Sequence, residues 1–170
     1  MLTSPFAAGA EITAASLASV APLFAFKFAD QNSGQSNTSL VNDTDLNLAL
    51  AANGTYAFFG MIIYSASTAA DYKCQLTVPA GAALNWSAYP FIGTGGSSYS
   101  TPQNLLTPSS NTPVAMGGQG TAQSQVATVI GSVVMGATTG NLQWQFAQQS
   151  SDASNLNTRA GSFLLAWQGA

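Results

Sequence analysis

Residues 55–64 are apolar on both faces of the β-strand that they predict, because neighbouring side chains of a strand point to opposite faces. One face carries Tyr56, Phe58, Ile62 and Tyr64, and the other carries Ala57, Phe59, Met61 and Ile63. Residues 126–135 and 161–167 share this property. An antiparallel sandwich normally buries one face of each sheet and leaves the other in water. With no helices in the sequence to cover the second face, the pattern predicts that other subunits cover it.

From Leu23 onward, apolar residues recur with period two and turn signals are closely spaced, which is typical of an all-β sandwich or barrel. Asn53-Gly54 and Pro79-Ala80-Gly81 are turn signals of this kind. The sequence therefore predicts an antiparallel β-sandwich domain over residues 23–170. The candidate strands are 23–29, 46–50, 55–64, 71–78, 82–89, 124–136, 142–146 and 161–167.

Two segments differ from this pattern. Residues 1–22 are rich in alanine, and Phe6, Ala10, Thr13, Leu17 and Val20 share one face at helical spacing. We expect an N-terminal arm, part extended and part helical, that becomes ordered against a neighbour; the alternative is a frayed tail. Residues 92–125 are dense in Gly, Ser, Thr, Pro, Asn and Gln. They predict a long surface loop that contacts a neighbouring subunit or presents a binding surface.

Charged residues make up only 5% of the 170-residue chain, against roughly a quarter of a typical soluble domain, and residues 74–151 carry no charge. A chain with so little charge tends to associate. Only three residues are basic, which argues against nucleic acid and anionic membranes as partners. The longest apolar runs are too short for a membrane helix, and the N-terminus lacks the positive region of a signal peptide. We therefore expect synthesis in a cytoplasm.

The chain lacks the residues that most enzymes need. It has no histidine, which excludes Ser-His-Asp and Cys-His sites, and its one cysteine cannot form an intrachain disulfide or a zinc cluster. Cys74 falls on an apolar strand face, so we expect a buried structural thiol. The sequence predicts no enzyme, no cofactor and no metal.

The remaining polar and aromatic candidates have structural interpretations. Asp43 and Asp45 open a segment that begins like a calcium loop but lacks the glycine and glutamate of one, and paired carboxylates also serve glycosidases. We expect them to mark a polar turn. Asp71 and Lys73 predict a local ion pair. Arg159 is expected to pair with Asp152 or with a carboxylate of another subunit. Three tryptophans could stack on sugars, but core or interface burial is favoured: Trp86, Trp144 and Trp167.

Two short motifs resemble segments of known structural proteins. The segment Asn53-Gly54-Thr55-Tyr56-Ala57-Phe58 and the segment Ala160-Gly161-Ser162-Phe163-Leu164-Leu165 resemble strands of trimeric C1q/TNF-like jelly rolls. The pattern over residues 23–168 also resembles small structural proteins of tailed actinobacterial phages. The positions that match those proteins are Asp43, Asp45, Leu46, Ala51, Asn53, Thr55, Tyr56, Phe58, Pro79, Gly81, Ala160, Gly161 and Ser162. The long loop after Phe91 has no counterpart. These resemblances imply a jelly roll, a homotrimer and a virion protein.

The first functional hypothesis is a capsid decoration protein, which binds as a homotrimer to the major capsid protein on the outside of the shell. Its predicted trimer interface is Tyr56, Phe59, Met61, Ile63, Phe163, Leu165 and Trp167. The residues of the arm predicted to contact the capsid are Phe6, Ile12, Leu17 and Val20. The alternative is a tail or fibre module that binds a host-surface glycan through the loop. A third hypothesis is a carbohydrate-active enzyme that uses Asp43 and Asp45.

Overall fold

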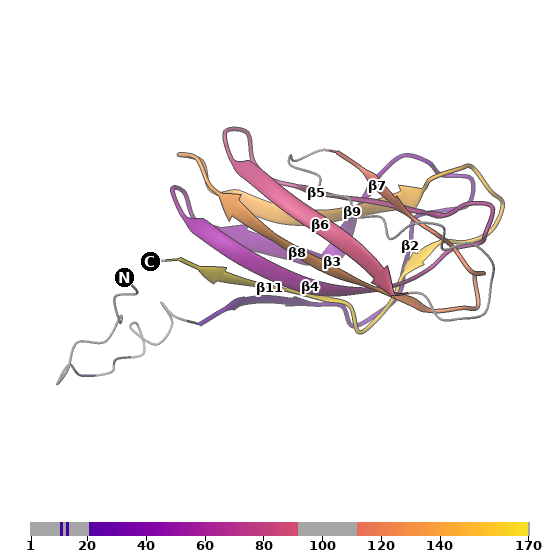
Figure 1. Cartoon of the computed structure of the whole chain (residues 1–170), viewed down its shortest axis with the longest axis horizontal. Coiled ribbons are helices and arrows are strands. Elements are labelled where there is room, and N and C mark those ends of the chain that lie inside the picture. The colour runs from indigo at the N-terminus through magenta and orange to yellow at the C-terminus, as the bar shows by residue number, and fades with distance from the viewer. Residues whose placement is uncertain (1–10, 12, 14–20, 92–111, 170) are drawn as a thin grey trace.

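The computed structural model describes residues 11, 13, 21–91 and 112–169. Within these residues the chain forms β-strands and no helix. The strands form two antiparallel sheets that face each other, so the predicted all-β sandwich is confirmed (Figure 1).

Sheet A, the larger sheet, is built around one long strand. Its strands are β1 (Leu23–Phe26), β2 (Gln31–Asn32), β4 (Thr55–Ser65), β6 (Ala83–Phe91), β8 (Gln125–Val134), β10 (Asn157–Thr158) and β11 (Phe163–Gln168). Strand β8 pairs with β4 along nearly its whole length, while β11 and then β10 pair with the opposite edge of β4. β1 extends the sheet beyond β11, and β6 extends it beyond β8. Five strands therefore lie side by side in the order β1-β11-β4-β8-β6.

Sheet B has four strands in the order β3-β9-β5-β7. They are β3 (Val41–Leu50), β5 (Tyr72–Thr77), β7 (Val114–Met116) and β9 (Gly140–Gln148). From β3 to β9 each strand lies in the opposite sheet to the one before it, which gives a jelly-roll-like path. The turn at Asn53-Gly54, where Asn53 adopts a φ of 58°, therefore joins the two sheets instead of closing a hairpin. Gly81, with a φ of 85°, does the same between β5 and β6.

Large aromatic side chains fill the space between the sheets. The rings of Trp86 and Trp144 meet edge to face at 6.1 Å, and Tyr72 stacks on Phe146 at 5.9 Å. The Tyr72 hydroxyl lies 2.6 Å from the Thr158 hydroxyl and accepts a hydrogen bond from Trp144 Nε1 at 3.1 Å. Burial raises the pKa of Tyr72 well above its usual value, so the phenol stays protonated. The interior is complete within one chain.

Three short strands lie outside the sequence prediction. β2 and β10 have two residues each, and β7 lies inside the predicted loop 92–125. Within the segment predicted as a loop, Val114–Met116 pair with β5 and bury Val114 and Met116 in the core. Residues 92–111 of that loop lie outside the described residues. So does almost all of the predicted arm, including the residues predicted to contact the capsid, Phe6, Ile12, Leu17 and Val20.

Candidate interaction surface

The outer face of sheet A, which points away from sheet B, carries apolar side chains in register. Across the first four strands, Phe24 of β1 lies opposite Leu165 of β11, Leu165 opposite Phe59 of β4, and Phe59 opposite Ile130 of β8. Side chains directly opposite each other on neighbouring strands are close enough to contact. The register of the four strands therefore places these apolar side chains in one continuous row across the sheet.

A second row runs parallel to the first, through Phe26, Phe163 and Met61. Phenylalanine rings join the two rows: Phe24 lies 6.2 Å from Phe163, and Phe59 lies 5.9 Å from Phe163. Ring pairs at these separations attract each other beyond their buried area. We call this surface, formed by the outward side chains of β1, β11, β4 and β8, the apolar face.

Exposure within the described chain is concentrated on this face. Each large hydrophobic residue that is clearly exposed lies on it or at its edge: Phe24 59%, Phe28 83%, Phe59 37%, Ile130 42%, Val134 50% and Trp167 45%. Phe28 follows β1 and packs its ring edge against Phe26 at 5.0 Å. None of β1, β4, β6, β8 and β11 contains a charged residue. A contiguous exposed apolar surface is typical of an interaction site.

The predicted interface residues divide into two groups. Phe59, Met61, Ile63, Phe163, Leu165 and Trp167 all lie on the apolar face. Tyr56 does not: it points into the core, is 3% exposed, and its hydroxyl accepts a hydrogen bond from the backbone N–H of Ala51. The interface prediction is therefore wrong for Tyr56. The interface itself stays a prediction for the other six.

Sequence reasoning missed several members of this surface. Phe24, Phe28, Ile130 and Val134 belong to it, although none was predicted as an interface residue. The signal was present, because Phe24, Phe26 and Phe28 alternate with Ala25 and Lys27. Residues 126–135 are also apolar on both faces in the sequence. The sequence does not give the register of this strand against β4, and that register places Ile130 beside Phe59.

The outer face of sheet B has the opposite chemistry. Gln75 Nε2 donates to Gln145 Oε1, and Gln145 Nε2 donates to Asn42 Oδ1 at 2.6 Å, so amides link β5, β9 and β3. Gln143 and Asn47 also lie opposite each other there. This face is suited to water and contrasts with the apolar face of sheet A.

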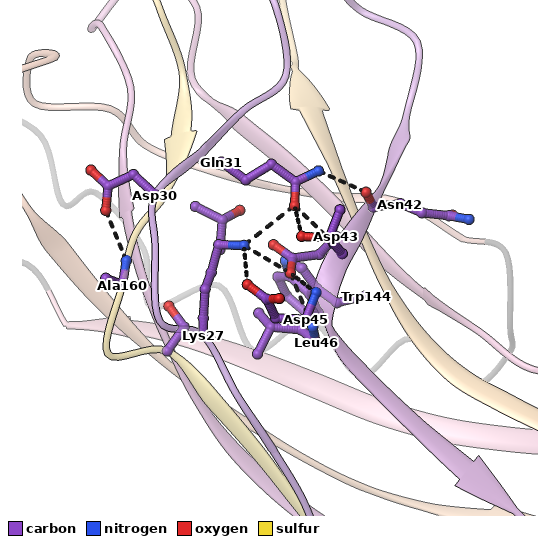
Figure 2. Close-up of polar contacts among 12 residues, drawn as sticks. Lys27, Asp30, Gln31, Asn42, Asp43, Asp45, Leu46, Trp144 and Ala160 are labelled. Atoms are coloured by element: carbon purple, nitrogen blue, oxygen red, sulfur yellow. Dashed lines mark hydrogen bonds and ion pairs between the residues drawn. The ribbon is translucent and has the colours of Figure 1, made fainter.

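The buried polar centre of the molecule lies between the two sheets at the end of β1 (Figure 2). Lys27 Nζ lies 3.0 Å from Asp43 Oδ1 and 3.2 Å from Asp45 Oδ2. Asp43 and Asp45 do not form the polar turn that was expected. They lie inside β3, where the register with β9 shifts between Asn42 and Asn47. Such a bulge leaves a residue free of the strand ladder and redirects its side chain.

Two other polar predictions are wrong. Asp71 and Lys73 do not form an ion pair: Asp71 Oδ1 accepts a hydrogen bond from the backbone N–H of Gly118, and Lys73 donates to the carbonyl of Thr38. Arg159 pairs with Asp30 at 3.5 Å rather than with Asp152, while its pairing with a carboxylate of another subunit stays a prediction. In each case the nearest partner comes from a segment distant in sequence, which local spacing does not reveal.

The remaining chemical candidates are enclosed. Cys74 is fully buried, as expected, and burial raises the pKa of its thiol well above the usual value, which makes it unreactive. Trp86 and Trp144 are also buried and cannot stack on a sugar, while Trp167 belongs to the apolar face.

A shallow hollow of about 370 Å³ lies beside the apolar face between β6 and β8, lined in part by Tyr89, Ile130 and Ser132. Within the described residues, no group of three or more Asp, Glu, Cys or His side chains is arranged to hold a metal.

No protein-family model matches the chain. No curated protein matches it either. Among solved structures, a chain in the structure of infectious bursal disease virus, Gx strain, is similar at 14% sequence identity with a TM-score of 0.20. The similarity covers 89% of this chain and 36% of that chain. Among the described residues, no helix is long and apolar enough to cross a membrane.

Proposed function

We propose that this protein is a phage capsid decoration protein that binds as a homotrimer to the outer surface of the capsid shell and stabilises the head. The observation that supports this proposal is the apolar face of sheet A. It is continuous across β1, β11, β4 and β8, and it contains no charge. Such a face is unfavourable in water and favours burial against another protein surface.

A second copy of the chain is the best occupant of this face. The face has no charge with which to select a partner of opposite charge, and it offers phenylalanine and aliphatic side chains that pack well against their own kind. At strand spacings of ~4.8 Å and ~3.4 Å per residue, the four strands of the apolar face cover roughly 500 Å² as a flat surface. Side-chain relief adds to that figure, which approaches the ~800 Å² per partner of a standard interface.

The trimer and the phage setting come from the sequence resemblances. In a three-fold assembly, one apolar face on each copy lies near the axis and contacts both neighbours. The major capsid protein would then be bound by the N-terminal arm through Phe6, Ile12, Leu17 and Val20. The action is passive, because each added contact buries apolar area at ~25 cal/mol per Å², less the ordering cost of binding.

Binding to purified capsids tests the decoration role. The recombinant protein is mixed with phage heads that lack it, and with host cells or cell-wall sugars as the comparison. We expect saturable binding to heads at many copies per particle, and greater resistance of the decorated heads to heat. Binding to cells or sugars, with few copies per virion and none on heads, would overturn the decoration role in favour of a tail or fibre module.

A further inference from the structure

We propose that Lys27 and Asp43 condense in the folded chain to form an intramolecular amide bond, with Asp45 as the proton carrier. The bond would link the end of β1 in sheet A to β3 in sheet B. This inference rests on the buried polar centre alone and is independent of the proposed function.

The reacting groups are buried and held in contact. Both side chains, Lys27 and Asp43, are fully buried, and Lys27 Nζ lies 3.0 Å from Asp43 Oδ1. Lys27 is fixed by its backbone, because its N–H donates to the carbonyl of Ser162 and its carbonyl accepts from Gly161, each at 2.9 Å. Gln31 Oε1 accepts a further hydrogen bond from Lys27 Nζ at 3.3 Å. Holding an amine against a carboxyl group in this way replaces a bimolecular encounter with an intramolecular one.

The two oxygens of Asp43 have different surroundings. Oδ1 accepts hydrogen bonds from the backbone N–H groups of Asp45 and Leu46, both at 3.0 Å. Oδ2 is buried and has no hydrogen-bond partner among the described residues. Backbone N–H groups aimed at one oxygen stabilise the negative charge that develops there when a nucleophile attacks the carbon. Oδ1 is therefore the oxygen that stays, and Oδ2 is the oxygen that leaves.

Asp45 can move the protons. Its Oδ2 lies 3.2 Å from Lys27 Nζ, and 35% of its side chain is exposed, so it contacts both the amine and solvent. It takes a proton from the Lys27 ammonium, which frees the nitrogen lone pair for attack on Asp43 Cγ. The Nζ–Cγ bond forms and the Cγ–Oδ2 bond breaks. One ammonium proton stays on the amide, and the other two leave with Oδ2 as water.

The reaction balances without an oxidant or any other reactant, because one ammonium and one carboxylate give one neutral amide and one water. Burial favours this direction. A buried ion pair retains the desolvation penalty of both charges, and a neutral amide removes both charges from the interior. Figure 2 shows Lys27, Asp43 and Asp45 together with their hydrogen bonds.

The mass of the intact denatured protein tests the proposal directly. We expect the wild-type chain to be lighter than its sequence mass by one water molecule. Lys27→Arg, which has no nucleophilic amine, and Asp43→Ala, which has no carboxyl group, are expected at full sequence mass. Wild-type protein that keeps its full mass after prolonged incubation in the folded state would overturn the proposal, whether or not either variant folds.

Trypsin locates the bond. The chain has only three cleavage sites, after Lys27, Lys73 and Arg159. An amide at Nζ blocks cleavage after Lys27, so we expect a single peptide of residues 1–73 that has lost one water. A loss that maps to any other peptide would reject the assignment. Asp43→Asn should lose ammonia in place of water, and Asp45→Asn should slow the loss; a purely structural ion pair produces neither result.

Discussion

On the outer face of sheet B, Asn42, Gln145 and Gln75 form a chain of side-chain amides across β3, β9 and β5. On the outer face of sheet A, the corresponding positions of β11, β4 and β8 are Leu165, Phe59 and Ile130. Both faces belong to the same sandwich and enclose one shared core. The difference shows that the fold of a single chain does not require the apolar face, because the core between the sheets is already complete without it.

The comparison assigns the two faces different tasks. The polar face satisfies its own side chains through amide hydrogen bonds. The apolar face carries the large hydrophobic residues that remain exposed in the described chain. Substitutions on sheet A should therefore change association more than folding, and substitutions on sheet B should do the reverse.

The largest effect is expected from a charge placed at the centre of the apolar face. Phe59→Asp should weaken association by about 3–5 kcal/mol, or roughly 10²–10⁴-fold, because each copy would bury an unpaired carboxylate. Sedimentation should detect the loss of the oligomer, with little change in the melting temperature of the chain. Ala49→Asp, at an exposed position on the outer face of β3, is the matched control and should leave the mass unchanged. An oligomer that survives Phe59→Asp would contradict the assembly role assigned to the outer face of sheet A.

A smaller effect is expected where an aromatic side chain is shortened. Trp167→Ala removes a 45% exposed ring from the apolar face and should weaken association by about 2 kcal/mol, or roughly 30-fold. Gln168→Ala, at the next position of β11, should have no such effect. Concentration series in the ultracentrifuge would measure both, and equal effects of the two substitutions would contradict the account.

The polar face should respond in the opposite way. Gln145→Ala removes the amide that links β5 to β3 and should lower the free energy of unfolding by about 0.5–1.5 kcal/mol. The oligomer mass should not change. Denaturant titration measures the first quantity and light scattering the second; a change of mass here would show that sheet B also takes part in assembly.

The smallest effects concern pH and salt. Because the strands of the apolar face carry no charge, added salt should not dissociate the oligomer. Hydrogen bonds from the Ser154 hydroxyl and backbone N–H, and from Ser67, lower the pKa of Asp152 below its ordinary 3.8. The stability that these bonds give is fully present above the ordinary pKa of 3.8. It is lost as the pH falls through the lowered pKa of the folded state. Thermal melts of wild type and Asp152→Asn should converge in acid; parallel curves would contradict this assignment.

The sequence predicted the long strands well, because residues 55–64 and 126–135 are rich in β-branched, aromatic and other apolar residues. It could not predict β2 and β10, since two-residue strands such as Asn157–Thr158 form only where tertiary pairing with Tyr64 and Ser65 permits. The apolar face was predicted in outline, and Tyr56 was misassigned because both faces of its strand are apolar.

The buried polar centre was missed for a related reason. Alternation from Leu23 and Ala25 places Lys27 on the inward face, and a buried lysine requires a carboxylate partner. Spacing alone does not identify Asp43 as that partner. The contact depends on the bulge in β3, which Gln143 supports by donating to the carbonyl of Asp43 at 2.8 Å. The polar residues of this bulge have a sequence pattern that is also typical of a turn, so the sequence predicted a turn here.

The solution mass of the wild-type protein at micromolar concentration tests the central claim most directly. We predict three times the chain mass of 17.3 kDa, with the apolar face covered by neighbouring copies. A particle of 17.3 kDa at every concentration measured would mean that Phe59, Phe163 and Leu165 stay in contact with water. That result would contradict the claim that this face exists for assembly.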